Sequence, residues 1–219
     1  MISPSFEFEK SLLPSDARYI LGLDEVGRGP WAGPVTVGAF LIELNSFNPE
    51  TFHNLGVRDS KMLSPRNRQK IYSYFQSQHF TYKTFSSSSK EIDEQGIGQV
   101  IKNLFKNALS QFSGRFDFAI IDGNLHIESS KYVSVVGADK SCFSVASASI
   151  VAKFIRDKEM NIFDQVYPQY GFASHKGYGT KAHLEALKAH GPSPIHRFSY
   201  NPIKNLLNTN NTMNSRAVY

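Results

Sequence analysis

Two short apolar stretches of this chain each end at an acidic residue, and this pattern limits the possible folds more than any other feature. Tyr19–Leu23 is followed by Asp24, and the segment "FDFAII" is followed by Asp122. Short apolar runs bounded by turn residues are typical of buried strands, whereas helices need longer periodic segments. Both stretches are therefore predicted to be strands that carry a carboxylate at their end.

The remaining pattern mixes strands with helices, which indicates an α/β fold. The predicted strands are Arg18–Asp24, Val35–Leu44, Phe80–Phe85, Phe116–Ile121 and Tyr132–Val136. The predicted helices are Pro65–Phe75 after an N-cap at Ser64, Ile97–Phe112, Ser141–Phe163 and Thr180–His190. Their order predicts a mixed five-stranded sheet with an antiparallel hairpin portion, flanked by helices. Ser88 and Glu91 have the spacing of a capping box.

Composition adds boundary conditions. The chain has 219 residues, which suits one domain with a small appendage, and no apolar run approaches the length of a membrane span. The N-terminus has no signal-peptide pattern. Cys142 is the single cysteine, and its small-residue surroundings predict a buried packing role. A single cysteine is compatible with a reducing compartment, so we expect a cytoplasmic protein.

The net charge of +5 is concentrated near the C-terminus. From residue 170 onwards there is one acid, Glu185, and six basic residues: Lys176, Lys181, Lys188, Arg197, Lys204 and Arg216. Such a basic segment is what a nucleic-acid partner would favour, although many proteins are mildly basic without one.

Four acids fall where strands end or helices begin: Asp24, Glu25, Asp122 and Asp139. Clustered carboxylates raise one another's pKa, and a hard divalent cation such as Mg²⁺ or Mn²⁺ would relieve their repulsion. Two such ions support in-line phosphoryl displacement. Because side chains alternate along a strand, Asp24 and Glu25 reach one site only if the chain bends there, and Gly27 and Gly29 permit a bend. Any one of these acids, taken singly, could instead be a solvated loop residue or a cap, a reading that fits the Asp24–Glu25 pair less well.

Three polar turns are candidate contacts for a nucleic acid. Gly27, Arg28 and Gly29 combine close backbone approach with a phosphate-binding fork, although a plain tight turn remains open. Tyr178, in "HKGYGT" before a helix, could stack on a sugar or base, or could be a half-buried aromatic. Lys61, in "RDSK", could contact a backbone phosphate or could simply be exposed.

Longer motifs then appear in order: "GLDEVGRGPWAGPV", "DSKMLS", "IDGN", "GADKS", "ASASIVAKFIRDKEM" and "YGFASHKGYGTKAHLEALKAHGPSPIHRFSYNPI". Together they resemble bacterial ribonuclease HII, from about Tyr19 to Pro202. The resemblance implies an RNase H-like fold with a C-terminal helical extension.

By the same resemblance, the expected activity is hydrolysis of RNA in RNA–DNA hybrids and nicking of duplex DNA 5′ of embedded ribonucleotides, with 3′-hydroxyl and 5′-phosphate products. The implied metal ligands are Asp24, Glu25, Asp122 and Asp139, with Mg²⁺ or Mn²⁺ as cofactor. Gly27, Arg28 and Gly29 would read the 2′-hydroxyl. Tyr178 would sense the step from ribonucleotide to deoxynucleotide.

The expected organisation is a lead-in (1–17), a catalytic core (18–165), a substrate-contacting region (166–204) and a frayed tail (205–219), in a monomer without membrane contact. Three alternatives stay open: another nuclease of this fold such as ribonuclease HIII, a basic binding module without catalysis, and a phosphate-binding metabolic enzyme. The last would be expected to show a Walker or dinucleotide pattern, and the sequence contains neither.

Overall fold

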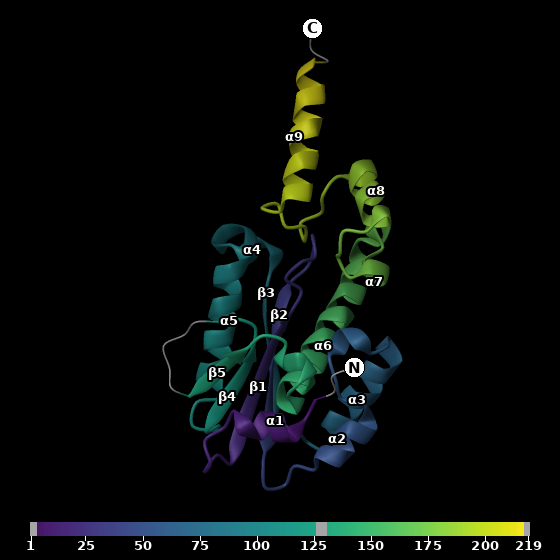
Figure 1. Ribbon diagram of the computed structural model, residues 1–219. Coiled ribbons are helices and arrows are strands. Elements are labelled where there is room, and N and C mark those ends of the chain that lie inside the picture. The colour runs from purple at the N-terminus through teal and green to yellow at the C-terminus, as the bar shows by residue number, and fades with distance from the viewer. Residues whose placement is uncertain (1–3, 126–130, 217–219) are drawn as a thin grey trace. The chain divides into compact units, whose positions relative to one another are not determined.

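The structure, a computed structural model, describes residues 4–125 and 131–216, with side chains as far as residue 208 (Figure 1). The chain divides into two compact units. The sheet unit comprises Met1–Val26, Thr36–Ser86 and Ile101–Ile155, and the helical unit comprises Gly27–Val35, Ser87–Val100 and Arg156–Tyr219. Each unit is made of three separate segments of the chain, so this division does not test the predicted boundaries at residues 17, 165 and 204, which stay a prediction.

All five predicted strands and all four predicted helices are present, alongside helices that the sequence analysis did not predict. The strands are β1 (Tyr19–Val26), β2 (Val35–Glu43), β3 (Tyr82–Ser87), β4 (Phe118–Asp122) and β5 (Tyr132–Val135). The α-helices are α1 (Phe6–Ser11), α2 (Pro49–Leu55), α3 (Pro65–Ser77), α4 (Ser89–Gln95), α5 (Ile97–Gln111), α6 (Phe143–Val166), α7 (Phe172–His175), α8 (Lys181–His190) and α9 (Asn201–Arg216). The helices that were not predicted include α1, α2, α7 and α9. Short 3₁₀ turns are η1 (Ser60–Met62), η2 (Ala138–Lys140) and η3 (Pro168–Tyr170). The predicted capping box at Ser88 and Glu91 is confirmed, as is the N-cap at Ser64.

The predicted mixed five-stranded sheet is confirmed, and its strands lie in the order β3-β2-β1-β4-β5 (Figure 1). β1 pairs antiparallel with β2, whereas β4 runs parallel to β1 and β5 runs parallel to β4. Parallel neighbours run toward the same edge of the sheet, so Asp24, two residues before the end of β1, lies next to Asp122, the last residue of β4. This topology positions the acids that the sequence singled out.

The first half of α6 lies directly on the central strands. A Cβ added to Gly22 of β1 would stand 2.1 Å from the backbone carbon of Ser144, and one added to Gly38 of β2 would stand 2.2 Å from the backbone oxygen of Ala148. The two glycines therefore let the helix backbone touch the sheet. This contact confirms the close packing expected from the serine- and alanine-rich segment.

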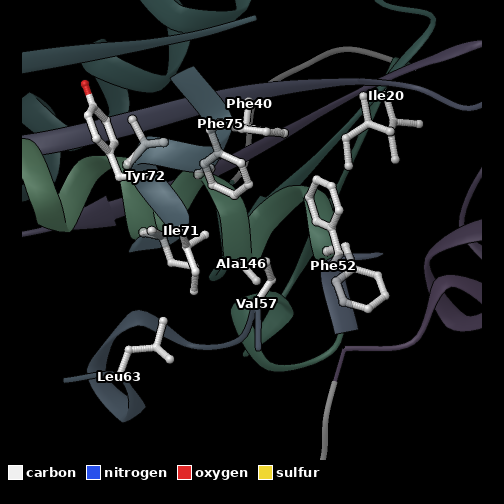
Figure 2. Close-up of a cluster of buried hydrophobic side chains, with 14 residues drawn as sticks. Ile20, Phe40, Phe52, Val57, Leu63, Ile71, Tyr72, Phe75 and Ala146 are labelled. Carbon is white, nitrogen blue, oxygen red and sulfur yellow. The ribbon is translucent and has the colours of Figure 1, made fainter. Parts of the chain in front are cut away.

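An aromatic cluster fills the space between β2 and the helices α2, α3 and α6 (Figure 2). The ring centroid of Phe40 on β2 lies 4.6 Å from that of Phe75 on α3 and 6.4 Å from that of Phe52 on α2. Phe40 and Phe75 are fully buried. Removing apolar area from water is worth about 25 cal/mol for each Å², so the burial of these rings stabilises the sheet unit.

A buried acid fastens the N-terminal helix to α6. The carboxylate of Glu9 on α1 accepts the backbone N–H groups of Phe143 (2.9 Å) and Ser144 (3.0 Å) and also the Ser144 hydroxyl. These are N–H groups that the first turn of a helix cannot satisfy by itself. Burial raises the pKa of Glu9 to about 7, against the lowering effect of the hydrogen bonds from Ser144 and Phe143.

This pKa predicts a specific pH dependence of stability. Between about pH 4.5 and 7 the folded chain keeps a proton on Glu9 that the unfolded chain has lost, so stability falls as pH rises through this window. Glu9→Gln removes that titration. The variant has a weaker contact with α6. Because only the wild type loses stability as Glu9 ionises, the free energy of unfolding of the variant minus that of the wild type should rise by about 2 kcal/mol between pH 5 and pH 8. Urea unfolding of both proteins at the two pH values measures the difference, and a pH-independent difference would contradict the assignment.

The helical unit has its own core, in which Met160 of α6 meets Phe172 of α7 and Leu187 of α8. Ile203, Leu206 and Leu207 of α9 belong to the same cluster. The sequence predicts a frayed tail from Asn205, but the structure contains a helix there, and the apolar residues at positions i, i+3 and i+4 explain why it forms. Within residues 4–125 and 131–216, no helix is long and apolar enough to cross a membrane.

Candidate active site

Asp24 is the buried centre of the acid group in the sheet unit. It lies two residues after Gly22 on β1 and so shares the face that α6 covers. Its exposed fraction is 4%, and the Ser149 side chain of α6 hydrogen-bonds to it. The close approach of α6 therefore both buries this carboxylate and supplies its hydroxyl partner.

Asp122 and Asp139 approach from the neighbouring strands. Leu23 pairs with Ile121, so the residues that follow, Asp24 and Asp122, lie side by side at the same edge of parallel strands. The Oδ1 atom of Asp122 accepts the Ala138 backbone N–H at 2.8 Å, which ties the end of β4 to η2. Asp139 is the next residue of that turn and is buried.

These carboxylates interact electrostatically. Burial raises the pKa of Asp24 well above its ordinary value, and the charges of Asp122, Glu25 and Asp139 raise it further. Burial also raises the pKa of Asp139 to about 6, with Asp122 and Asp59 adding to the shift and Lys61 and Lys140 opposing it. The sheet edge is therefore a site of concentrated negative charge that favours the binding of a cation.

The expected bend between Asp24 and Glu25 is wrong, because β1 continues through both residues. Glu25 pairs with Val37 and Val26 pairs with Thr36, and the chain turns only at Gly27, whose φ is 94°. In a regular strand adjacent side chains point to opposite faces, so Glu25 is directed away from the face that carries Asp24. Among the described residues, no group of three or more Asp, Glu, His or Cys side chains is arranged so that it could hold a metal ion.

Asp59 is a further candidate site residue, which the sequence reasoning missed. It is buried, it accepts the Lys61 backbone N–H at 2.9 Å as the N-cap of η1, and its charge raises the pKa of Asp139. Arg68 fixes the same turn by donating to the backbone oxygens of Ser60 and Leu63 at 3.0 and 2.6 Å. Lys61 is exposed and acts on the charge of Asp139. An aspartate two residues before a lysine in a polar turn was the available signal.

The GRG turn belongs to the helical unit, and its two glycines differ. Gly27 needs its left-handed φ, and a Cβ there would stand 2.4 Å from Nε of Arg156. Gly29 has no such constraint, since a Cβ there would meet only Tyr178 Cε1, at an ordinary 3.9 Å. Arg28, Gly29 and Tyr178 are all exposed, and the Trp31 N–H donates to the Gly177 oxygen at 2.8 Å. The helical unit thus places Gly29 beside Tyr178.

A chain of buried hydrogen bonds holds the Tyr178 turn. Nδ1 of His183 lies 3.0 Å from the backbone carbonyl oxygen of Tyr178, and Nε2 of His183 lies 2.9 Å from Nε2 of His196. The Ser193 N–H donates to Nδ1 of His196 at 2.8 Å, so the proton of His196 is on Nε2 and is donated to Nε2 of His183. His183 therefore carries its own proton on Nδ1 and donates it to the backbone oxygen of Tyr178. Burial lowers the pKa of both histidines to about 4, which keeps both rings neutral near pH 7. The spacing of these histidines gave no sequence signal for this role.

Comparison with known proteins places this arrangement in a family. The family model described as ribonuclease HII matches residues 21–203. A ribonuclease HII of Mycoplasma capricolum subsp. capricolum is 40% identical over 196 residues, which cover 89% of this chain and 92% of that protein. The chain belongs to the ribonuclease HII family. The predicted resemblance is confirmed.

Solved structures support the ribonuclease HII assignment at the level of the fold. The ribonuclease H2 of Pyrococcus horikoshii OT3 superposes with a TM-score of 0.74 at 26% identity and covers 87% of this chain and 98% of its own. A Bst ribonuclease HIII, solved in complex with Mn²⁺, has a TM-score of 0.65 at 17% identity, with 87% and 70% coverage, and shares the fold. Membership of the ribonuclease HII family makes the chain a hydrolytic endoribonuclease and implies cleavage of RNA in RNA–DNA hybrids.

Proposed function

We propose that the chain also nicks duplex DNA on the 5′ side of single embedded ribonucleotides, leaving 3′-hydroxyl and 5′-phosphate ends, with a divalent cation as cofactor. The observation that carries the cofactor is the meeting of Asp24 and Asp122 at one edge of the parallel strands β1 and β4, where the charge of Asp122 helps to raise the pKa of Asp24 and of Asp139. The observation that supports recognition of a single ribonucleotide is the exposed Gly29 beside the exposed Tyr178.

The donor chemistry at the sheet edge suits a hard cation. The proposed ligands, Asp24, Glu25, Asp122 and Asp139, offer only carboxylate oxygens, the donors that Mg²⁺ and Mn²⁺ prefer. In this proposal the acids come together only when the ion binds, because Glu25 is directed to the opposite face of β1 and no three of the described acids are already arranged around one metal position. Manganese is the ion in the Bst ribonuclease HIII structure. A bound divalent cation supplies an activated water and neutralises charge that develops on the phosphate.

The remaining roles fall to side chains and backbone groups that bind the substrate. Lys61, exposed in the sheet unit, would neutralise a backbone phosphate. Arg28 offers a planar guanidinium for a second phosphate contact. In this proposal Gly27 and Gly29 bring the backbone against the ribose, and Tyr178 packs at the junction with the following deoxynucleotide.

Product mapping on a duplex with one ribonucleotide, with and without Mg²⁺ or Mn²⁺, tests the proposal. Cutting that needs no divalent ion, or no cutting of this duplex, would refute it.

Gly29→Ala should separate recognition from folding. The structure has room for the extra methyl group, so the melting temperature should not change. The methyl group would instead meet the substrate, and kcat/KM on a duplex with one ribonucleotide should fall about tenfold or more. Gly27→Ala should lower both stability and activity, because its Cβ clashes with Arg156 and its φ is strained for alanine. Normal cleavage by Gly29→Ala would show that this turn does not approach the ribose.

A further inference from the structure

Arg197 is an interior side chain that binds the backbone of the GRG segment. It is fully buried. Its Nη2 donates to the Gly27 oxygen at 2.6 Å, and its Nη1 donates to the Arg28 oxygen at 3.0 Å. Nε and Nη2 also donate to the Gly33 oxygen, at 3.0 and 2.9 Å, and Nη2 reaches the Pro34 oxygen at 3.0 Å. Arg197 is one of the basic residues near the C-terminus that a nucleic-acid partner would favour. In the structure its guanidinium instead donates to backbone carbonyl groups inside the helical unit.

A second buried arginine binds the same segment. Nε of Arg156 donates to the Pro34 oxygen at 2.8 Å and Nη2 donates to the Ala32 oxygen at 3.3 Å. Its Nη1 donates to the Lys176 oxygen at 3.1 Å, so it links this segment to the turn that carries Tyr178. Burial, with a contribution from the charge of Arg197, lowers the pKa of Arg156 to about 10. Two cations are thus kept in the interior where apolar side chains would pack more easily.

Tyr200 completes the group. Its hydroxyl donates to the Arg28 oxygen at 2.6 Å and accepts from Nη1 of Arg197 at 2.9 Å. The Arg28 oxygen therefore receives two donors, while the Gly27 oxygen receives one. In a trans peptide the N–H points away from the C=O of the same unit, and the described residues contain no cis peptide. Fixing these two oxygens inward therefore directs the N–H groups of Arg28 and Gly29 toward the opposite, exposed side.

We infer that Arg197, together with Tyr200 and Arg156, is a positioning residue for ribose recognition: it orients the peptide groups of the GRG turn so that their N–H groups face the ribonucleotide. The inference rests on the proposed reading of a single ribonucleotide. A loop could be held by apolar packing alone, but packing does not fix which way a peptide group faces. A planar fork with several donors does, and lysine, with a single nitrogen, cannot replace it.

The decisive variant is Tyr200→Phe, which keeps the ring and removes one donor to the Arg28 oxygen. Its matched control is Tyr170→Phe, because the Tyr170 hydroxyl donates to the Gly191 oxygen at 2.7 Å, a bond of the same kind away from the GRG segment. Arg197→Lys is the stronger variant. The readout is the binding preference for a duplex with one ribonucleotide over the all-DNA duplex of the same sequence, measured without divalent cation so that no cleavage occurs. A simple loss of folded protein leaves this ratio unchanged.

The preference should fall about fivefold in Tyr200→Phe and further in Arg197→Lys, and should stay at the wild-type value in Tyr170→Phe. If the wild type cuts the ribonucleotide duplex but the two test variants keep its preference, the inference is wrong and the proposed function stands. A wild type that cuts but binds both duplexes equally would also overturn the inference. A wild type that does not cut this duplex at all would instead overturn the proposed function. If Arg197→Lys does not fold, Tyr200→Phe still decides.

Discussion

Asp122→Asn should reduce cleavage of an RNA–DNA hybrid by about 100-fold or more while the protein remains folded. Asparagine keeps the oxygen that accepts the Ala138 N–H, so the link from β4 to η2 survives. The substitution removes one negative charge from the sheet edge where we propose that the cation binds. Initial rates on a labelled hybrid, at saturating Mg²⁺ and Mn²⁺, measure the loss.

The same substitution should not lower stability, and this sets it apart from ordinary damage. Because Asp122 raises the pKa of Asp24 and Asp139, its charge repels theirs, and removing it relieves repulsion when no cation is present. Unfolding in EDTA should therefore show a variant at least as stable as wild type. Activity and stability would move in opposite directions, as expected where function maintains an unfavourable charge group.

Asp117→Asn is the matched control. One oxygen of Asp117 accepts the backbone N–H groups of Arg18 and Tyr19 at 2.8 and 2.9 Å, at the opposite end of β1 from Asp24. This variant also loses one negative charge from the sheet unit, but away from the acid group, and should cut at close to the wild-type rate. Wild-type cleavage by Asp122→Asn would remove Asp122 from the site.

Gly22→Ala should destabilise the protein by about 3 kcal/mol or more. The added methyl group would lie 2.1 Å from the backbone carbon of Ser144 and 2.5 Å from the backbone nitrogen of Val145. Backbone atoms have no rotamer to change, so either α6 must move off the sheet or β1 must distort. Urea unfolding monitored by circular dichroism measures the loss.

Activity should fall with Gly22→Ala even in the fraction that folds. Displacing α6 would pull Ser149 away from Asp24 and disturb the burial on which the acid group depends. Gly98→Ala is the control, since a Cβ at this helical position meets nothing within 4 Å and should be neutral or stabilising by up to about 1 kcal/mol. If Gly22→Ala unfolds like wild type, the direct contact between helix and sheet is not what holds α6 in place.

The sequence predicts the elements well wherever the signal is local. The strand end at Asp122, the cap at Ser64 and the capping box at Ser88 depend on residues a few positions apart and lie where the pattern predicts them, whereas β1 runs two residues past its predicted end at Asp24. For the candidate site, the structure brings some of the predicted acids together and directs another away. Asp24 and Asp122 meet because β1 and β4 run parallel, whereas the predicted bend is wrong because β1 stays paired with β2 through Glu25.

What escaped prediction depends on contacts between distant parts of the chain. Arg197 lies 170 positions from Gly27, so no window of sequence distinguishes this interior cation from an exposed phosphate contact. The charge of Asp59 acts on Asp139, 80 positions further along the chain, and no local pattern shows that these two turns lie near each other. The helix α9 forms over an asparagine-rich stretch because a few leucines find an apolar cluster.

The anchoring of α1 has a practical consequence for handling the protein. Besides the Glu9 carboxylate, the Ser5 N–H donates to the Ser141 oxygen at 2.9 Å, so the segment ahead of the first strand holds the residues from Ser141 to Ser144 by main-chain and side-chain bonds alike. Trimming this segment to improve expression or crystallisation would leave the opening amides of the longest helix without acceptors, next to the turn that carries Asp139. Affinity tags are better attached so that residues 5–9 keep their place.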